Sequence, residues 1–331
     1  MIGIVLAAGL GTRLRPYSDL VSKAAMPAAG VPIVLRVIEQ LRRAGVNGRI
    51  VVIARSPEHD IVPLIEADAR HNGYEVAFGY QGEQRGSADA LIQVPGRHAL
   101  VERDEHVLIG ACDNLYEPDE IARLVEQHRS SGADGTMAVL RVPPEKIAAS
   151  SNVVTENNRV VRIIEKPRLD EITPPQSGGS PLRGGSPFCG PMLYAFSPRV
   201  FAYLDAVRPS LRGELEFQDA MQAFLDDGAR VGWFELSRRT TLTSPADLLA
   251  LNERFFGATS LPMPVPRRGV AFEPPCIVDE GVTIGPGSTV GPNAHLMRGC
   301  RVGARCTIRH ALVFPGAQVA DGTIVERTLV A

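Results

Sequence analysis

The sequence predicts an α/β domain, built on a Rossmann-like and mostly parallel sheet, followed by a parallel β-helix. Over the first 255 residues or so, short apolar runs alternate with longer amphipathic ones, as expected for strands that alternate with covering helices. In the tail, apolar residues instead recur every six positions, which is typical of a β-helix. We therefore expect a larger domain over residues 1–257, a linker over 258–270 and a β-helix over 271–331.

The first half of the larger domain shows the alternation clearly. Met1–Ala7 is an apolar run that meets a glycine turn, so it predicts a buried strand, and Val31–Ala44 predicts a helix closed by Gly45. The same patterns predict strands at Arg49–Ala54, Glu75–Tyr80, His106–Ala111 and Gly135–Val142, and helices at Pro57–His71, Ser87–Gln93 and Pro118–Ser131. Ligands of such sheets bind beyond the carboxyl ends of the strands.

After Val153 the pattern becomes less regular. It predicts strands at Arg159–Glu165, Met192–Phe196 and Val231–Leu236, and helices at Pro198–Leu204, Leu215–Asp227 and Pro245–Phe256. Between the first two of these strands, Gln176–Gly190 is rich in glycine, serine and proline, which predicts a mobile loop.

The tail carries two interleaved registers. Apolar residues occupy the first, at Val278, Ile284, Val290, Leu296, Val302, Ile308, Phe314 and Ala320. Small or apolar residues occupy the second, at Val282, Ser288, Ala294, Cys300, Cys306 and Leu312. Hexads of this kind form the sides of a triangular coil, so residues 276–329 predict three coils. Because so short a β-helix has an open end, we expect it to pack on the larger domain or on a second subunit, with His295 and His310 at its surface.

Composition argues against several classes of function. A formal net charge of −2 offers no general attraction for nucleic acid or for an anionic membrane. Five cysteines without a Cys-x-x-Cys pair predict neither a disulfide framework nor a zinc site, and they favour a reducing cytoplasm. No stretch approaches a membrane span, and the apolar opening lacks the basic leader of a signal peptide.

The loop after the first strand is the most informative segment. It reads Leu6-Ala-Ala-Gly-Leu-Gly-Thr-Arg-Leu-Arg-Pro16, and Ser22-Lys-Ala-Ala-Met-Pro27 follows. A glycine turn exposes backbone amides that can cradle phosphate, while Arg13 adds a bidentate cation and Lys23 a point charge. A dinucleotide fingerprint would need glycine where Leu14 stands, and a Walker loop needs Gly-Lys-Ser/Thr, which the chain lacks. The pattern therefore predicts a different grip on a triphosphate.

These segments closely resemble the signature of the sugar-1-phosphate nucleotidylyltransferase family, which includes glucose-1-phosphate thymidylyltransferases and mannose-1-phosphate guanylyltransferases. Further matches follow in the family's order: Gln81-Gly-Glu-Gln-Arg-Gly-Ser-Ala-Asp-Ala-Leu91 resembles the base-recognition segment, Ala111-Cys-Asp-Asn114 the Gly-Asp-Asn turn, Val160-Val-Arg-Ile-Ile-Glu-Lys-Pro167 the Glu-Lys-Pro segment, and Arg212-Gly-Glu-Leu-Glu-Phe-Gln-Asp219 a helix-opening motif. The tail resembles the hexapeptide-repeat left-handed β-helix. The resemblance covers residues 1–255 and, with the tail, nearly the whole chain.

The resemblance implies a nucleotide-diphospho-sugar transferase fold and a role for each matched residue. The nucleotide is expected at Ala7, Ala8, Gly9, Gly11, Thr12, Arg13, Gln81, Gly86 and Asp113. The sugar phosphate is expected at Asn152, Glu165 and Lys166, where Glu165 binds hydroxyls and Lys166 the phosphate. Asp113 is the expected Mg²⁺ ligand, and the expected catalytic set is Arg13, Lys23, Asp113 and Lys166.

The implied chemistry is in-line attack of a sugar-phosphate oxygen on the α-phosphorus, with pyrophosphate leaving. Two polyanions must be brought together, so the protein chiefly positions them and neutralises charge. No general base is needed, because a sugar phosphate is already ionised at neutral pH.

Two positions depart from the family pattern near the end of the larger domain. Aligned on Pro245-Ala-Asp-Leu248, Thr241 takes the place of the second metal aspartate and Arg239 that of a tryptophan. Three explanations stay open: Asp113 and substrate phosphates hold Mg²⁺ alone, a nearby carboxylate such as Glu235 or Asp247 substitutes, or the chain has lost turnover.

The substrates also stay open. Gln81 resembles a glutamine that pairs with uracil or thymine, which favours dTTP or UTP, with GTP close behind. Ser151-Asn152 stands where the family often has an aromatic–Gly pair beside the sugar, so the acceptor is either a hexose or a cyclitol phosphate.

The main hypothesis is an active nucleotidylyltransferase that self-associates and contacts neither nucleic acid nor membrane. The alternative is a weakened, regulatory homologue that binds nucleotide-sugars. An acyltransferase acting through the β-helix is disfavoured, because the tail lacks a histidine in a plausible coil-interface motif.

Overall fold

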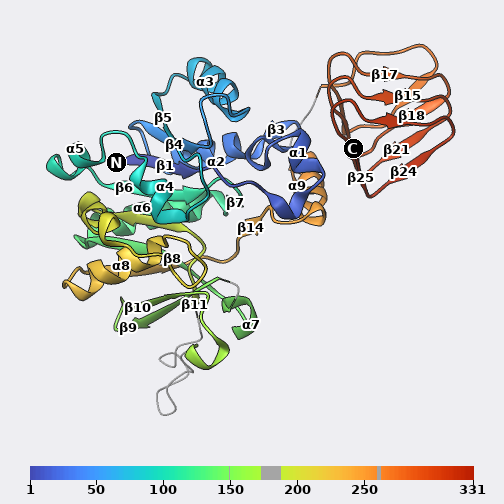
Figure 1. The fold of residues 1–331 in the computed structure, drawn as a ribbon. Coiled ribbons are helices and arrows are strands. Elements are labelled where there is room, and N and C mark those ends of the chain that lie inside the picture. Colours follow the sequence, from blue (N-terminus) through green and yellow to red (C-terminus); the bar gives the residue numbers. More distant parts are fainter. Residues whose placement is uncertain (149, 173–187, 259–261) are drawn as a thin grey trace. The chain divides into compact units, whose positions relative to one another are not determined.

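The structure is a computed structural model, which describes residues 1–148, 150–172, 188–258 and 262–331. The chain divides into two compact units, and Figure 1 labels their helices and strands. Unit 1 consists of Met1–Gly9 and Val34–Thr240, and unit 2 of Leu10–Ile33 and Thr241–Ala331. The domain boundaries at residues 257 and 270 stay a prediction, and residues 259–261 of the predicted linker lie outside the described residues.

Unit 1 is built on a ten-stranded sheet with the path β10-β9-β11-β8-β12-β6-β1-β4-β5, and β13 pairs with β8. Its strands are β1 Ile2–Leu6, β4 Ile50–Ala54, β5 Val76–Tyr80, β6 Val107–Ala111, β8 Gly135–Arg141, β9 Ser151–Glu156, β10 Arg159–Glu165, β11 Phe188–Cys189, β12 Leu193–Phe196 and β13 Val231–Glu235. β11 corrects the end of the predicted loop Gln176–Gly190, whose residues 176–187 lie outside the described residues.

The prediction of a mostly parallel sheet is right for one half of it. The neighbours β6, β1, β4 and β5 are parallel, whereas β12, β11, β9 and β10 form antiparallel pairs. The turn between β9 and β10 explains part of the difference. Asn157 and Asn158 both have positive φ, as a two-residue hairpin requires, and a hairpin joins antiparallel strands only.

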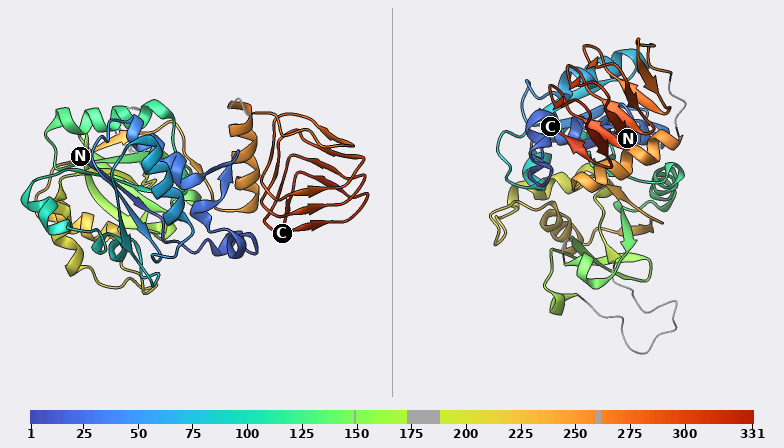
Figure 2. Two further views of the ribbon diagram at one scale, coloured as in Figure 1. Left: turned by 90° about the horizontal axis from the view of Figure 1, so that it is seen from above. Right: turned by 90° about the vertical axis from the view of Figure 1, so that its right-hand side faces the viewer.

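Helices cover both faces of this sheet (Figure 2). They are α2 Ile33–Arg43, α3 Ile61–Asn72, α4 Ser87–Ile92, α5 Arg97–Glu102, α6 Pro118–Ser131, α7 Pro144–Ile147 and α8 Phe217–Asp226, with the 3-10 helices η3 Leu169–Glu171 and η4 Pro198–Ala206. α6 has the predicted bounds, because Asp119 and Glu120 lie in its first turn and Gly132, with φ 59°, ends it. The predicted helix Pro198–Leu204 is a 3-10 helix. No helix in the described ranges is both long and apolar enough to cross a membrane.

Unit 2 joins an N-terminal segment, one long helix and the C-terminal strands. Its first part contains η1 Thr12–Leu14, α1 Tyr17–Leu20, η2 Lys23–Ala25, β2 Pro27–Ala28 and β3 Val31–Pro32, and its helix is α9 Pro245–Ala258. Asn252 of α9 links these parts, because its Oδ1 accepts from Ala29 N at 2.8 Å and its Nδ2 donates to Pro27 O at 2.9 Å. Such contacts group Leu10–Ile33 with Thr241–Ala331.

Residues 270–331, called here the C-terminal coil, form three parallel sheets with the orders β15-β18-β21-β24, β16-β19-β22-β25 and β17-β20-β23. This is consistent with the predicted β-helix, whose left hand stays a prediction. The strands are β15 Val270–Phe272, β16 Cys276–Val278, β17 Thr283–Ile284, β18 Ser288–Val290, β19 Ala294–Leu296, β20 Arg301–Val302, β21 Thr307–Arg309, β22 Ala311–Val313, β23 Gln318–Val319, β24 Ile324–Glu326 and β25 Leu329–Val330.

The predicted register of the coil is wrong after Ile308. Val290 pairs with Ile308, but Leu296 pairs with Val313, so the later interval is one residue shorter. The residue is lost at a corner, where Arg309-His310 replaces the longer Gly291-Pro292-Asn293. Beyond this corner, Phe314 and Ala320 leave the predicted interior positions, and the core residues are Val313, Val319 and Val325.

His295 is also not where the sequence predicts it. Its side chain is buried, with 3% exposed, and its Nε2 lies 2.9 Å from Asp279 Oδ1. His310 is half-buried rather than freely exposed, and its Nδ1 lies 3.0 Å from Glu253 Oε1 of α9. Both histidines therefore have a carboxylate partner, His295 within the coil and His310 on α9, which Figure 2 shows beside the coil.

Candidate functional site

The loops after β1, β5 and β6 begin at one edge of the sheet. Ala7 N donates to Ile53 O at 2.9 Å, Gln81 N to Ala54 O at 2.9 Å, and Cys112 N to Leu6 O at 3.0 Å. Each loop therefore continues the ladder for one residue before it leaves the sheet. Ala7 and Ala8 are buried, and Gly9 is exposed. The structure thus brings the start of the predicted phosphate loop to the same edge as the predicted base-recognition segment.

A side chain ties these two segments together. Gln84 Nε2 donates to Ala8 O at 2.9 Å. Because Gln84 belongs to the Gln81–Leu91 segment and Ala8 to the phosphate loop, the link keeps the two in contact. The family resemblance assigns no role to Gln84, and nothing in the sequence distinguishes this residue from its polar neighbours.

Gln81 is buried, and its amide group is held from within the protein. Its Nε2 donates to Gly86 O at 2.9 Å and to Asp89 Oδ2 at 2.9 Å. Since both partners are acceptors, the orientation of the amide is fixed. Arg85 in turn donates to the other oxygen of Asp89 at 2.8 Å. The oxygen Oε1 is therefore the atom of Gln81 with which it can contact a ligand.

Gly86 is required by a close approach of the chain. Its φ is 112°, and a Cβ at this position would lie 2.3 Å from Leu215 O. Ala88 N donates to the same oxygen at 2.9 Å, and Leu215 N donates to Arg85 O at 2.6 Å. The structure thus brings together two segments that the sequence singles out separately, Gln81–Leu91 and Arg212–Asp219.

Asp113 lies two residues beyond the last residue of β6, in the turn that the sequence predicts at this strand end, and its side chain is partly buried. The next residues form the short strand β7 (Asn114–Leu115), which anchors the turn. Asn114 Nδ2 donates to Pro191 O at 3.0 Å, and the Tyr116 hydroxyl donates to the same oxygen at 2.7 Å. These bonds fix the turn that carries Asp113 against the chain before β12.

Magnesium fits this position by its chemistry. Residues 1–148, 150–172, 188–258 and 262–331 contain no group of three or more His, Cys, Asp or Glu side chains that could hold a metal. Mg²⁺ keeps several waters and takes one or two carboxylates together with substrate phosphates, so a single aspartate at a strand end is an adequate protein ligand.

The two carboxylates considered as substitutes for a second metal ligand have other partners. Glu235 forms a bidentate ion pair with Arg141, at 2.9 and 3.1 Å. Asp247 accepts from Thr243 N at 2.8 Å and from Ser244 N at 2.7 Å, in the manner of a capping residue at the start of α9. Neither contact supports a substitute ligand, and Asp113 stays the predicted metal ligand.

Lys166 and Glu165 lie at the end of β10, beside the start of β9. Glu165 pairs with Ser151 across the two strands, and Lys166 N donates to Ser150 O at 2.6 Å. Lys166 is exposed and has a φ of 43°, a conformation that costs energy for a residue with a side chain. Gly190 N donates to Ser151 Oγ at 3.2 Å, so the chain before β12 joins this region to the Asp113 turn.

Glu165 has an altered acidity. The pKa of Glu165 is raised to about 7, chiefly by burial and then by the charge of Glu216, while the charge of Lys166 opposes the rise. Glu216 is itself buried and forms an ion pair with Arg212. A carboxyl group that titrates near neutrality can accept or donate hydrogen bonds to sugar hydroxyls.

Asn152 is more deeply placed than a surface ligand contact would be. It is 1% exposed, its Nδ2 donates to Phe188 O at 3.3 Å, and its buried Oδ1 has no partner within the described residues. The buried hydroxyl of Tyr194 likewise has no partner in the described part of the chain. Burial, and then the charge of Glu165, raise the pKa of Tyr194, so the carboxylate of Glu165 acts on the Tyr194 hydroxyl.

Arg239 is a cation at this site to which the sequence assigned no role. Arg238 is exposed and its Nε binds Glu117 Oε1, whereas Arg239 beside it is half-buried. Burial raises the pKa values of Tyr116, Cys189 and Tyr194, and the charge of Arg239 opposes that rise in all three. No ion pair of Arg239 is found among the residues that the structure describes.

The remaining predicted residues belong to unit 2. Gly11 has a φ of 65° and accepts from Leu14 N at 2.8 Å, which forms the turn of η1. Thr12 and Arg13 are exposed on this turn. A Cβ at Gly11 would lie 2.9 Å from Lys23 Cβ, so the absence of a side chain at Gly11 lets η1 and η2 approach. The structure therefore brings the predicted Arg13 turn and Lys23 into one local arrangement.

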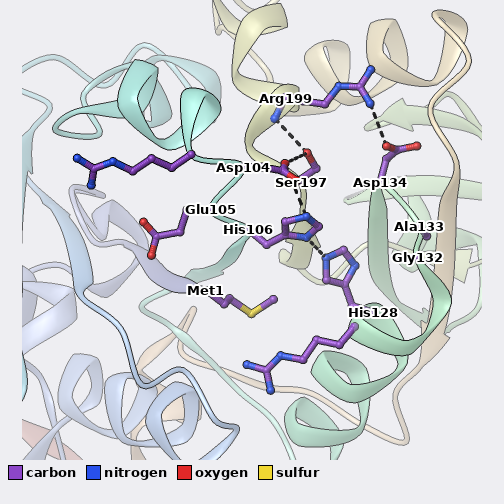
Figure 3. Close-up of a pocket in the computed structure, with 12 residues that line it drawn as sticks. Met1, Asp104, Glu105, His106, His128, Gly132, Ala133, Asp134, Ser197 and Arg199 are labelled. Carbon is purple, nitrogen blue, oxygen red and sulfur yellow. Dashed lines mark hydrogen bonds and ion pairs between the residues drawn. The ribbon is translucent and has the colours of Figure 1, made fainter.

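A cavity of about 710 Å³ lies at the opposite edge of the sheet (Figure 3). His106 and Asp134, which directly precede β6 and β8, line it. His106 Nδ1 lies 2.7 Å from His128 Nε2, and burial, then the charge of His106, lower the pKa of His128 to about 4. None of the predicted site residues lines this cavity, and the amino ends of the strands are not where ligands of such sheets bind.

Comparisons with known proteins give a consistent result. A nucleotidyl transferase family model matches residues 2–239, and a GMPPB C-terminal domain model matches residues 272–331. The low-salt glycan biosynthesis nucleotidyltransferase Agl11 of Haloferax volcanii is 29% identical over 260 residues, which cover 76% of this chain and 65% of that protein. A glucose-1-phosphate thymidylyltransferase of Streptomyces griseus is 27% identical over 98% of this chain and 84% of its own length. A UDP-glucose pyrophosphorylase structure has a similar fold, with a TM-score of 0.62 at 14% identity over 78% of this chain and 99% of that one.

Proposed function

The chain belongs to the nucleotidyl transferase family, and on this premise we propose that it joins a nucleoside triphosphate to a sugar 1-phosphate or a cyclitol phosphate and releases pyrophosphate. One observation carries the proposal. At the carboxyl edge of the sheet, the Asp113 turn and the start of the phosphate loop follow the adjacent strands β6 and β1, and the buried Gln81 follows β5, which is separated from β1 by β4 alone. A nucleotide bound along this edge would have its base at Gln81, its phosphates at the phosphate loop and its metal at Asp113.

For the nucleotide, we assign the backbone amides of Ala8 to Thr12 and the cations Arg13 and Lys23 to the phosphates. Loop amides and a forked guanidinium bind phosphate oxygens that become the leaving pyrophosphate. Gln81 is assigned to the base. Because its Nε2 is occupied by Gly86 and Asp89, its Oε1 must accept a hydrogen bond, which suits the N3–H of thymine or uracil. The N1–H of guanine is the alternative, so dTTP or UTP leads and GTP follows.

For the acceptor, we assign Lys166 to the phosphate and Glu165 to the hydroxyls. Lys166 is exposed at the end of a strand, and its side chain carries the charge that an incoming phosphate needs. Asn152 is assigned to the same subsite on the family resemblance alone, since its side chain is only 1% exposed. Arg239 adds positive charge behind this subsite. With both phosphates held, attack on the α-phosphorus needs no protein base.

Asp113 is the residue that would hold Mg²⁺, together with phosphate oxygens and water. When bound, the metal supplies charge neutralisation at the reacting phosphates. Asn114 and Tyr116 would keep the aspartate at the end of β6, since both are tied to Pro191.

A second candidate function is supported by Thr241, which stands where the family pattern has an aspartate. It is a regulatory protein that binds nucleotide-sugars without turnover. A panel of dTTP, UTP and GTP against hexose and cyclitol phosphates, read by Mg²⁺-dependent pyrophosphate release, separates the two. Turnover of any pair supports the enzyme. Binding of a nucleotide-sugar by calorimetry without turnover of any pair supports the regulator.

Arg13→Ala tests the phosphate grip directly. We expect kcat/KM to fall by about 10²–10³-fold, as for the loss of one donor to transition-state charge. The matched control is Arg15→Ala, since Arg15 is also exposed in this loop and pairs with Asp19 at 3.2 Å. An Arg13→Ala variant with the activity of the control would remove the assignment of Arg13.

A further inference from the structure

One outer face of the C-terminal coil is apolar, although a free β-helix would present polar residues there. The side chains of the sheet β16-β19-β22-β25 alternate between core and outer face. Its outward row consists of Ile277, His295, Leu312 and Leu329, which pair with one another in order. Leu312 is fully buried without belonging to the core of the coil. Other parts of unit 2 therefore cover this face.

The cover comes from the segment that carries Arg13 and Lys23. The Tyr17 hydroxyl donates to Leu329 O at 3.1 Å, and its ring centroid lies 4.9 Å from that of Phe314. Gly30 approaches the first strand of the same sheet, since a Cβ there would lie 2.8 Å from Ile277 Cδ1. Tyr17 stands between Arg13 and Lys23 in the sequence, so the loop is held at a point between its two cations.

The short corner at Arg309-His310 creates this contact. In the unbroken hexad register Phe314 would occupy the interior of the coil. Because the corner lacks one residue, Val313 takes the interior position, and Phe314 follows the strand as a fully buried side chain against Tyr17. The irregularity in the repeat therefore packs the ring of Phe314 against Tyr17 of the loop segment.

The same corner also binds α9. Asn293, His310 and Arg327 stand at equivalent corners, and all have φ between 49° and 54°. His310 Nδ1 lies 3.0 Å from Glu253 Oε1, and Arg327 Nη1 donates to that oxygen at 3.4 Å. Positive φ is unfavourable for histidine and arginine, so the contacts with Glu253 compensate a strained backbone. The preceding residue of α9, Asn252, holds the β2–β3 hairpin that follows Lys23.

We propose that the C-terminal coil is a positioning element for the nucleotide loop, with Tyr17 and Phe314 as its positioning residues. The coil holds residues 12–23 at Tyr17, and through α9 it holds the hairpin after them. This rests on the proposed function, in which Arg13 and Lys23 bind the triphosphate. Ordering the loop before the nucleotide arrives lowers the entropy cost of binding.

The test compares full-length Phe314→Ala and Phe314→Leu with Val313→Ala. Phe314 touches the loop, whereas its neighbour Val313 lies in the core of the coil, so Val313→Ala weakens the coil without removing the loop contact. In Phe314→Ala we expect amide exchange in residues 12–23 to rise about tenfold, and the KM for the nucleotide to rise by a similar factor. The KM for the sugar phosphate should stay within about twofold. Phe314→Leu should recover part of both effects, and Tyr17→Phe, which loses the bond to Leu329 O, should show a smaller change in the same direction.

Three outcomes overturn the proposal. One is unchanged exchange in residues 12–23 of Phe314→Ala. The second is raised exchange with an unchanged nucleotide KM. The third is an equal effect on exchange and KM in Val313→Ala. Failure of the proposed function looks different, because amide exchange is measured without substrates: in that case the exchange result stands while Arg13→Ala leaves nucleotide affinity unaltered.

Discussion

The internal bonding of Gln81 leads to a prediction about stability. Its Nε2 donates to one neutral carbonyl, that of Gly86, and to the carboxylate of Asp89, which is 3% exposed. A hydrogen bond to a neutral group is worth about 1 kcal/mol and one to a charged group about 2 kcal/mol. Gln81→Met removes both, so the free energy of unfolding should fall by about 3 kcal/mol.

Gln81→Glu should cost more at neutral pH, because it places a carboxylate where an amide now donates to Asp89 at 2.9 Å. Leaving a buried charge without its partner costs about 3–5 kcal/mol. One of the two carboxyl groups must then hold a proton, so its folded-state pKa rises above the unfolded value. The sign follows: the folded protein binds the extra proton, and the variant should recover stability relative to the wild type as the pH falls from 7.5 to 5.5.

Urea unfolding at these two pH values measures both effects. Gln84→Glu is the matched control, since Gln84 lies in the same segment but is exposed, and it should change stability by no more than about 0.5 kcal/mol. A Gln81→Glu variant as stable as the wild type at pH 7.5 would refute the bond to Asp89. Such a result would also refute the inference that Oε1 is the amide atom of Gln81 that binds the base.

Three further predictions concern the metal, the cavity and the acceptor. Thr241→Asp should raise the Mg²⁺ affinity measured by calorimetry, and no change or a fall would show that this position does not face the metal. His128 has its pKa lowered from 6.5 to about 4, so the folded state loses stability as pH falls through this window, by about 3 kcal/mol in total. In urea unfolding, His128→Phe should remove that pH dependence, and an unaltered slope would contradict it. Glu165 has a pKa of about 7, so if its ionised form binds the sugar, kcat/KM for the sugar phosphate should rise between pH 6 and 8, and Glu165→Gln should flatten the profile.

Elements with a long periodic pattern could be predicted from the sequence. The helix Pro118–Ser131 and the strand Arg159–Glu165 have the predicted bounds, because each shows a full period between clear end signals. The helices α5 and α7 were not predicted, since six and four residues are too few to display a helical period. The direction of β12 was not predicted either, because an apolar run fixes burial but not its partner.

The C-terminal coil shows a different limit. Its period predicts parallel strands, but a corner shorter by one residue leaves no local signal, since Phe314 still falls on an apolar position of the hexad. Only pairing between distant strands distinguishes Phe314 from Val313 as the interior residue. The burial of His295 has a similar origin, because it depends on pairing between successive turns of the coil and on its contact with Asp279 of the preceding turn.

The site shows the same contrast between positions in the chain, which could be predicted, and bonding partners, which could not. The sequence predicted Gln81 and Asp113 at strand ends, and they lie there. It could not predict that the side-chain amide of Gln81 donates both of its hydrogen bonds within the protein. Nor could it predict that Asn152 is buried with an oxygen that has no partner among the described residues. Both features depend on neighbours such as Gly86 and Phe188. Those partners come from other turns of the chain.

The two departures from the family pattern change the local charge in the same direction. Thr241 removes a negative charge, and Arg239 adds a positive one where a neutral tryptophan is usual. Arg239 is half-buried, and its charge acts on Tyr116, which directly follows β7 and the Asp113 turn. A site that binds two polyanions is stabilised by positive charge. A second metal carboxylate contributes such charge by helping to hold Mg²⁺, and the guanidinium of Arg239 contributes part of it directly. Loss of the aspartate therefore does not by itself imply loss of turnover, which is why we favour the enzyme over the regulator.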